Sequence, residues 1–136
     1  MHKFTVFCLA LCLSLVPSAV VAAKYDGSVP LLCAVIEVLE CEAGAECHRG
    51  DAESVNLPSF VKVDVPQKVL GTTAAAAEQR TTPIKHVEQL DGRLILQGGE
   101  GGRAWSLIIA EGTGKLTATT TDDRVGFVIF GACTPF

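Results

Sequence analysis

The chain has 136 residues and a net charge of −4, with 49% hydrophobic and 19% charged residues. This length suits one domain and is short for two. The acidic balance excludes the basic surface typical of nucleic-acid-binding proteins, and the apolar content excludes a disordered chain.

The first 23 residues have the order of a secretory signal peptide. A weakly basic start precedes an apolar run from Phe4 to Val16, and small residues fill Ala19 to Ala23. A membrane span needs about 20 apolar residues, and Pro17 ends this run too early. We therefore expect residues 1–23 to be removed on export. Residues 24–136 would then form one soluble domain in the periplasm or outside the cell, without membrane contact.

Short runs of strand-forming residues alternate with turn residues along the rest of the chain. We expect strands over Leu32–Glu40, Phe60–Val65, Lys68–Thr73, Arg80–Leu90, Arg93–Gln97, Trp105–Ile109, Lys115–Thr121 and Val125–Ala132. In the second run Val61, Val63 and Val65 share one face. Pro83 weakens the fourth run, because proline cannot donate to a strand ladder.

The segments between these runs are mostly short turns. Asp91-Gly92 is typical of a two-residue hairpin turn, and Gly98–Gly102 is expected to form the next turn. Glu42–Pro58 is interpreted as a long loop or a helical turn, and Ala74–Ala77 as a short helix or a linker. Because short links favour antiparallel neighbours, the sequence predicts an all-β meander.

We expect this meander to form an eight-stranded barrel or a strongly rolled sheet, with a small β-sandwich as the alternative. A barrel of this size can hold one small ligand, or its own side chains can fill it. The chain has one Trp, one Tyr and six Phe residues, two of them in the expected signal peptide. So few aromatic residues favour a filled interior.

Four cysteines follow the expected signal peptide, which predicts two disulfides in an exported protein. Cys33 and Cys41 lie in one expected strand, about 26 Å apart if it is extended, and so cannot pair. The favoured pairs are Cys41–Cys47 and Cys33–Cys133, the second of which places the last strand beside the first. The alternative pairs are Cys33–Cys47 and Cys41–Cys133.

Two motifs suggest a dinucleotide or a metal site, but the sequence around each of them argues against such a site. Gly99–Ala104 fits a G-x-G-x-x-A pattern, but an expected strand follows it where a dinucleotide site needs a helix. Cys41, Cys47 and His48 could ligate a metal, but export favours a disulfide over free thiolates. We therefore expect no cofactor and no metal.

Candidate binding residues fall into two groups. Trp105, Arg103 and Arg93 are expected near the Gly-rich turn. His48 precedes the tripeptide Arg49-Gly50-Asp51, which integrins read in other proteins and which falls in the expected long loop. That loop belongs to an acidic stretch, residues 37–53, with six acids and one arginine. Such a surface is most often solvated, and it can also steer a cationic partner.

One histidine could serve acid–base chemistry. His86 has Glu88 near it in the sequence, and Asp64 or Ser106 could complete a hydrolytic arrangement if the fold brought them together. No nucleophile–base pair can be assembled from sequence spacing alone.

Several segments carry a resemblance to other proteins. They are Gly92–Gly98 (GRLILQG), Gly102–Ile109 (GRAWSLII), Thr113–Thr117 (TGKLT), Gly126–Pro135 (GFVIFGACTP), Ser54–Pro58 (SVNLP) and the Cys33…Cys41…Cys47 start. These segments resemble small exported proteobacterial proteins of unassigned function, over most of the mature chain. In outline, with a signal, a meander and a final Gly-x-Cys, the chain is also similar to periplasmic barrels that inhibit lysozyme. The second likeness implies a barrel fold and a protein partner.

The sequence thus predicts an exported, non-enzymatic binding protein. One form of this prediction is an inhibitor of a basic enzyme such as lysozyme, which uses a loop or the acidic residues 37–53 to meet a cationic protein. The alternatives are a carrier that holds a small ligand inside the barrel, and a hydrolase that uses His86 with a nearby carboxylate. Nucleic acid is not expected as a partner.

Overall fold

The structure, a computed structural model, describes residues 24–136, and the expected signal peptide at residues 1–23 lies outside the described residues. The described chain forms nine strands and one short 3₁₀ helix. They are β1 (Leu31–Glu42), β2 (His48–Gly50), η1 (Glu53–Val55), β3 (Phe60–Asp64), β4 (Val69–Thr72), β5 (Thr81–Leu90), β6 (Arg93–Glu100), β7 (Arg103–Ala110), β8 (Lys115–Thr121) and β9 (Val125–Pro135).

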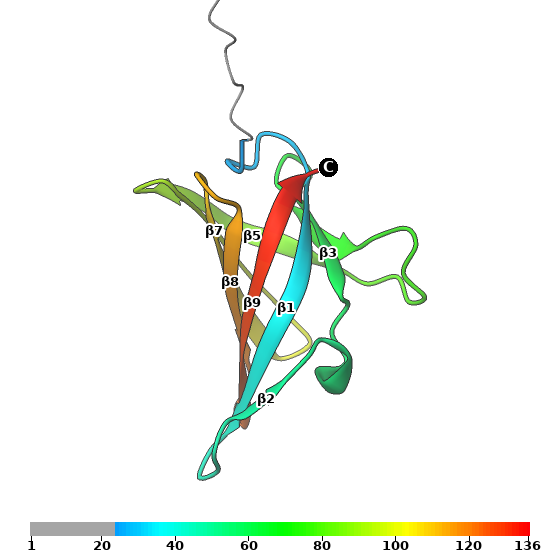
Figure 1. The fold of residues 1–136 in the computed structure, drawn as a ribbon, viewed down its shortest axis with the longest axis vertical. Coiled ribbons are helices and arrows are strands. Elements are labelled where there is room, and N and C mark those ends of the chain that lie inside the picture. The colour runs from blue at the N-terminus through cyan, green and yellow to red at the C-terminus, as the bar shows by residue number, and fades with distance from the viewer. Residues whose placement is uncertain (1–23) are drawn as a thin grey trace, which may run out of the picture.

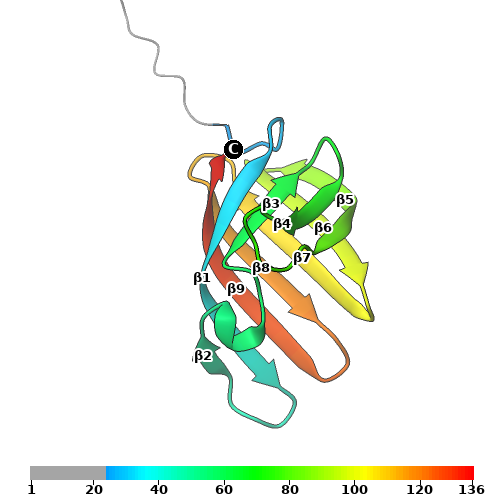
Figure 2. The ribbon, with the colours of Figure 1, turned by 90° about the vertical axis from the view of Figure 1, so that its right-hand side faces the viewer.

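Eight of these strands close into an antiparallel barrel. The sheet runs β1-β3-β4-β5-β6-β7-β8-β9, and β9 pairs back onto β1, so that the sheet has no free edge there. Figures 1 and 2 show β1 and β9 side by side, with the other strands wrapped around to meet them. The all-β barrel expected from the sequence is confirmed, and the sandwich alternative is excluded.

β1 is longer than the barrel wall needs. Its first half, Leu31–Ala34, pairs with β3, and its second half, Val38–Glu40, pairs with the extra strand β2. β9 pairs with β1 along its whole length, with a bulge between Val35 and Glu37. The β1–β2 hairpin therefore extends past the barrel, as Figure 2 shows.

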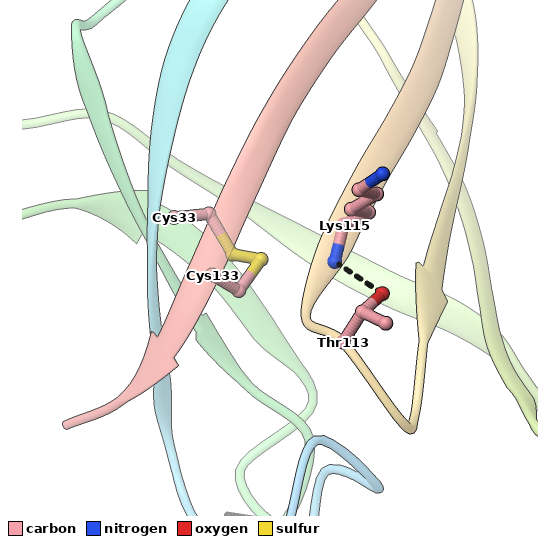
Figure 3. Close-up of a disulfide and its surroundings, with 4 residues drawn as sticks. All are labelled: Cys33, Thr113, Lys115 and Cys133. Atoms are coloured by element: carbon pink, nitrogen blue, oxygen red, sulfur yellow. Dashed lines mark hydrogen bonds between the residues drawn. A yellow bond between two sulfur atoms is a disulfide. The ribbon is translucent and has the colours of Figure 1, made fainter.

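Both expected disulfides are present. Cys33 of β1 lies directly opposite Cys133 of β9, with their Cα atoms 3.9 Å apart, so the bridge clamps the first and last strands of the barrel (Figure 3). Cys41 and Cys47 close the tip of the β1–β2 hairpin. The alternative pairing of these four cysteines is excluded.

The turn at Asp91-Gly92 forms as its sequence predicts, whereas the turn expected over Gly98–Gly102 is shorter. Asp91 and Gly92 have φ of 49° and 71°, as the expected two-residue hairpin turn requires. The next turn is narrower than expected, because Gly101 and Gly102 alone form it and Gly98 belongs to β6. Gly98 pairs with Trp105 of β7, and the indole occupies the space that a side chain at Gly98 would fill.

The other differences from the expected elements are small. The segment expected as a long loop contains β2 and η1. Ala74–Ala77 is a linker of turns and bends. Pro83 limits the pairing of β5 on one side only, because the ladder to β6 begins after it, at Ile84. Toward β4, Pro83 pairs with Val69 between two hydrogen-bonded positions, one of which joins Ile84 N to Lys68 O at 2.9 Å. The missing N–H of Pro83 therefore removes no bond to β4.

The two ends of the barrel differ. The closed end, where β1 begins and β9 ends, is packed with large inward side chains: Leu31, Val63, Leu94, Leu96 and Ile109, each completely buried. Tyr25 packs against this cluster, and Gly27 is buried beside it, so the segment before β1 covers the closed end. The other end, where β5 and β7 begin, is called the mouth below. Phe127 and Ile129 pack beside Val38 near the mouth.

Candidate ligand-binding cavity

The barrel interior is filled at the closed end and hollow toward the mouth. The hollow part is an open cavity of about 640 Å³. Small-molecule sites in proteins usually measure about 300–1,000 Å³. The filled interior favoured by the low aromatic content is therefore correct for only half of the barrel.

The size of the inward side chains explains the cavity. Inward positions alternate along each strand, and at the closed end they carry leucine, isoleucine and valine. Around the mouth the corresponding positions carry mostly smaller residues: Val35, Val61, Thr72, Thr82, Gly98, Ala118 and Thr120. Because a ring of small residues cannot fill a barrel of eight strands, the part of the interior toward the mouth stays open.

The inner wall of the cavity is apolar. Leu70, Leu107 and Ile129 line it from three different strands, and Cys33 brings the buried disulfide to the part of the cavity nearest the closed end. Threonine hydroxyls lie nearer the mouth. A molecule in this cavity would therefore place its apolar part deep and its polar part near solvent.

Trp105, the single tryptophan of the chain, forms part of the cavity wall. One side of its indole covers Gly98, and its Nε1–H donates to Oγ1 of Thr82 at 3.3 Å. These two contacts fix the ring in one orientation. The ring is thus a rigid, flat surface against which a ligand can pack.

Arg80 holds the mouth together. Its guanidinium donates to the backbone oxygen of Asn56 at 2.8 Å and to Oδ1 of the same residue at 3.1 Å, and it pairs with Glu78. The hydrogen bond from Arg80 holds the pKa of Glu78 below its ordinary value, and the same bond raises the pKa of Arg80. These contacts tie the loop that contains η1 to the segment before β5.

A second, shallower hollow of about 480 Å³ lies on the other side of the Arg80–Asn56 contacts. Four residues line both spaces and so form the partition between them: Leu57, Pro58, Thr72 and Arg80. Because Arg80 belongs to this partition, its contacts with Asn56 also keep the two spaces apart.

The first group of sequence-predicted residues is split by the fold. Trp105 lines the cavity as described. Arg103 lies at the mouth, where its Nε is 3.2 Å from Oδ2 of Asp122. The prediction that Arg93 lies near the Gly-rich turn is wrong, because β6 runs for eight residues and Arg93 begins it, at the closed end. There Arg93 donates to the backbone oxygen of Asp91.

The second predicted group lies on the β1–β2 hairpin, outside the cavity. His48 and Arg49 belong to β2, and Nε of Arg49 is 3.2 Å from Oε1 of Glu37. Asp51 follows, and its Oδ1 accepts the backbone N–H of Ser54 at 2.9 Å. The charged groups of the Arg49-Gly50-Asp51 tripeptide are thus engaged within the protein.

Of the candidate hydrolytic residues, only His86 and Glu88 lie close together. His86 Nε2 lies 3.6 Å from Oε2 of Glu88, but these side chains are 57% and 50% exposed on the outer face of β5. Gln97 of β6 pairs with Ser106 of β7 on one side and with His86 of β5 on the other. His86 and Ser106 are therefore two strands apart, about 10 Å. Asp64 is engaged elsewhere, with Lys62 at 3.4 Å.

The hairpin cysteines also bear on metal binding. Cys41 and Cys47 are joined in a disulfide, so they present no thiolates beside His48. Over residues 24–136 there is no group of three or more metal-ligating side chains suited to an ion.

Sequence reasoning missed most of the cavity. Gly98 was assigned to a turn, and Thr82, Arg80 and Glu100 were not singled out. The available signal was the recurrence of small residues at same-face positions, from Thr72 to Thr120, opposite the large residues of the closed end. That pattern becomes visible only once the strand register is known.

No protein-family model, no curated protein and no solved structure matches the chain. Within residues 24–136 no helix is long and apolar enough to cross a membrane. The two disulfides indicate an oxidising environment outside the cytoplasm.

Proposed function

We propose that this protein binds one small, largely apolar molecule inside the barrel and performs no chemistry on it. The observation that carries the proposal is the cavity of about 640 Å³, open at the mouth and walled by Trp105. Eight-stranded barrels are wide enough to hold one such ligand. This is the carrier role that the sequence left as an alternative.

The chemistry of the wall defines the ligand in outline. Leu70, Leu107 and Ile129 offer apolar surface, whose burial against a ligand is worth about 25 cal/mol per Å². The fixed ring of Trp105 adds a flat contact area at little entropic cost, because its orientation is already set by Gly98 and Thr82. The wall therefore suits a compact apolar or aromatic body.

Two threonine hydroxyls of the wall, those of Thr72 and Thr82, support binding over catalysis. A hydroxyl nucleophile needs an adjacent base. Oγ1 of Thr72 accepts the backbone N–H of Arg80 at 3.0 Å, and that of Thr82 accepts the indole N–H of Trp105. His86 lies on the outer face of β5. These hydroxyls position neighbouring groups, as the proposed non-enzymatic role requires.

The proposal is tested with pyrene, an uncharged aromatic probe, and the exported protein. Pyrene accepts excitation energy from tryptophan, so occupancy of the cavity is expected to quench Trp105 and sensitise pyrene, saturating at one molecule per chain. Ala118→Phe fills the cavity from β8 and should weaken binding at least tenfold. Thr117→Phe is the matched control, because it adds the same ring to the exposed side of β8.

Two results would defeat the carrier role. The first is an absence of saturable energy transfer at any protein concentration. The second is equal binding of pyrene by the Ala118→Phe and Thr117→Phe variants, which would place the probe outside the barrel.

A specific observation favours a second function, inhibition of a basic enzyme such as lysozyme. The β1–β2 hairpin extends past the barrel, is closed by the Cys41–Cys47 bridge and exposes Glu42 and Glu46. Such a tip suits a cationic protein partner. Titration with lysozyme at low and high salt tests this role, since a charge-driven complex should weaken as salt rises. Absence of binding at low salt would remove it.

A further inference from the structure

We propose that the ligand carries a positively charged amine, which lies at the mouth between Glu100 and the ring of Trp105. This inference rests on the proposed function, because it names the chemical class of the molecule that enters the cavity. It follows from the balance of charges around the mouth.

Glu100 stands at the edge of the cavity. It is the last residue of β6 and lies on the same strand face as Leu96 and Gly98, so it follows the inward register. It lines the cavity together with Trp105. Because Gly98 pairs with Trp105, the Cα atom of Glu100 lies about 7 Å further along the strand toward solvent.

Two of the three arginines around the mouth have carboxylate partners, and the third, Arg124, follows Asp123 on the turn between β8 and β9. Arg80 pairs with Glu78, and Arg103 pairs with Asp122 at 3.2 Å. Both carboxylates have a pKa below the ordinary value, with the hydrogen bond from Arg80 as the largest cause for Glu78, and backbone N–H groups as the largest cause for Asp122. All four groups are therefore charged at neutral pH, and Arg80 and Arg103 are each matched by one acid.

Two charged residues line the cavity, Arg80 and Glu100, and of these only Glu100 forms no ion pair within residues 24–136. It lies opposite Arg103 in the β6–β7 register, yet Arg103 forms its ion pair with Asp122. The cavity lining thus carries one unpaired negative charge, that of Glu100, beside the ring of Trp105. This arrangement favours a cation over a neutral or anionic group.

The surrounding groups suit an ammonium in particular. An ammonium has three donors and no acceptor. Glu100 offers carboxylate oxygens, and Thr120, which pairs with Trp105 in the β7–β8 register, offers a hydroxyl on the cavity wall. Tryptophan is the best aromatic partner for a cation, and the ring of Trp105 lines the cavity while its six-membered part lies against Gly98.

A set of three probes with one body tests the inference. Naphthylmethylamine, naphthylmethanol and naphthoate carry a positive, a neutral and a negative group on the same ring, and each is measured by displacement of pyrene. We expect the amine to bind about fivefold more tightly than the alcohol, as an exposed charge pair with an aromatic contribution allows, and the acid to bind weakest. Rising salt should reduce the preference.

Variants then assign the preference to Glu100. Glu100→Gln should remove most of the amine preference and leave only the part that comes from the ring of Trp105, while the alcohol keeps its affinity. Glu111→Gln, which removes the same charge at a turn of the closed end, should leave the amine preference intact apart from a small change. Arg103→Gln should strengthen amine binding, since it removes the cation opposite Glu100.

The outcomes separate this inference from the proposed function. Equal binding of amine and alcohol by the unmodified protein would overturn the amine while leaving the carrier role in place. An amine preference that keeps its full size in Glu100→Gln would also overturn it. If neither pyrene nor any naphthyl probe binds, the carrier role itself is wrong, and the amine inference is lost with it.

Discussion

The indole of Trp105 occupies the space above Gly98 on the neighbouring strand. A Cβ atom built on Gly98 would lie 2.6 Å from Cε2 of Trp105 and 2.7 Å from the backbone oxygen of Pro83. No side chain fits there unless the ring moves. The glycine therefore sets the orientation of the cavity wall, and the wall in turn sets what the cavity can hold.

Gly98→Ala should displace the ring. We expect a loss of about 1–3 kcal/mol in the free energy of unfolding, as is usual when a tight site is overfilled, together with a shift in tryptophan emission. Urea unfolding followed by fluorescence measures both. Gly112→Ala is the control, because a Cβ atom there meets nothing within 4 Å. Equal stability of the two variants would contradict the tight packing at Gly98.

Removing the Cys33–Cys133 bridge should destabilise the barrel more than removing Cys41–Cys47. The first bridge spans a sequence separation of 100 residues and the second a separation of 6. Loop entropy gives about 4.7 kcal/mol for the long bridge and about 2 kcal/mol for the short one. Urea unfolding of the two double Cys→Ala variants compares them. A larger loss for the hairpin bridge would contradict the clamp between β1 and β9.

Asp122 should contribute to stability in a pH-dependent way. Its pKa is held below the ordinary value of 3.8, chiefly by the backbone N–H groups of Val125 and Arg124 and also by Arg103. A carboxyl whose pKa is lowered by folding stabilises the fold above its unfolded pKa. That contribution disappears as the pH falls from about 4 through the lowered pKa.

Replacing this carboxylate should therefore flatten the acid side of the stability profile. Asp122→Asn is expected to be less stable than the unmodified protein at pH 6 and closer to it at pH 2. Thermal unfolding across this range measures the difference, with Asp123→Asn on the same turn as the control. A constant difference between the Asp122→Asn variant and the unmodified protein at every pH would show that charge at Asp122 is not involved.

Arg80 should restrain the loops of the mouth. Arg80→Ala removes the bonds to Asn56, which lies 24 residues away in sequence, and the pair with Glu78. We expect faster amide hydrogen exchange over residues 53–57 and 73–79, with the closed end unchanged. Arg93→Ala is the matched control, because its guanidinium contacts only its own turn. Unchanged exchange in both loops would contradict the bracing role.

Local rules predicted the parts of the fold that depend on few residues. The alternation of Val61, Val63 and Val65 and the turn at Asp91-Gly92 needed only neighbouring positions, and both are confirmed. Barrel closure followed from cysteine spacing, because Cys133 was the one partner that Cys33 could reach under the favoured pairing. The strand alternation, the hairpin turn and the barrel closure could be predicted because each depends on only a few residues.

The cavity depends on features that the sequence does not display. Bulges beside Ile36 and Lys85 shift which residues face inward, so same-face positions cannot be counted along β1 or β5. The Gly98–Gly102 run allows several two-residue turns, and contact with Trp105 on the next strand selects one. β2 has only three residues, too few for any periodicity to predict it.

Fluorine NMR of the protein labelled with fluorotryptophan tests the carrier role most directly, because the single tryptophan gives a single resonance from the cavity wall. Titration with naphthylmethylamine should move this resonance and saturate at one equivalent, and Ala118→Phe should abolish the shift. A resonance that stays unmoved while equilibrium dialysis shows the amine bound would place the ligand elsewhere and contradict binding inside the barrel.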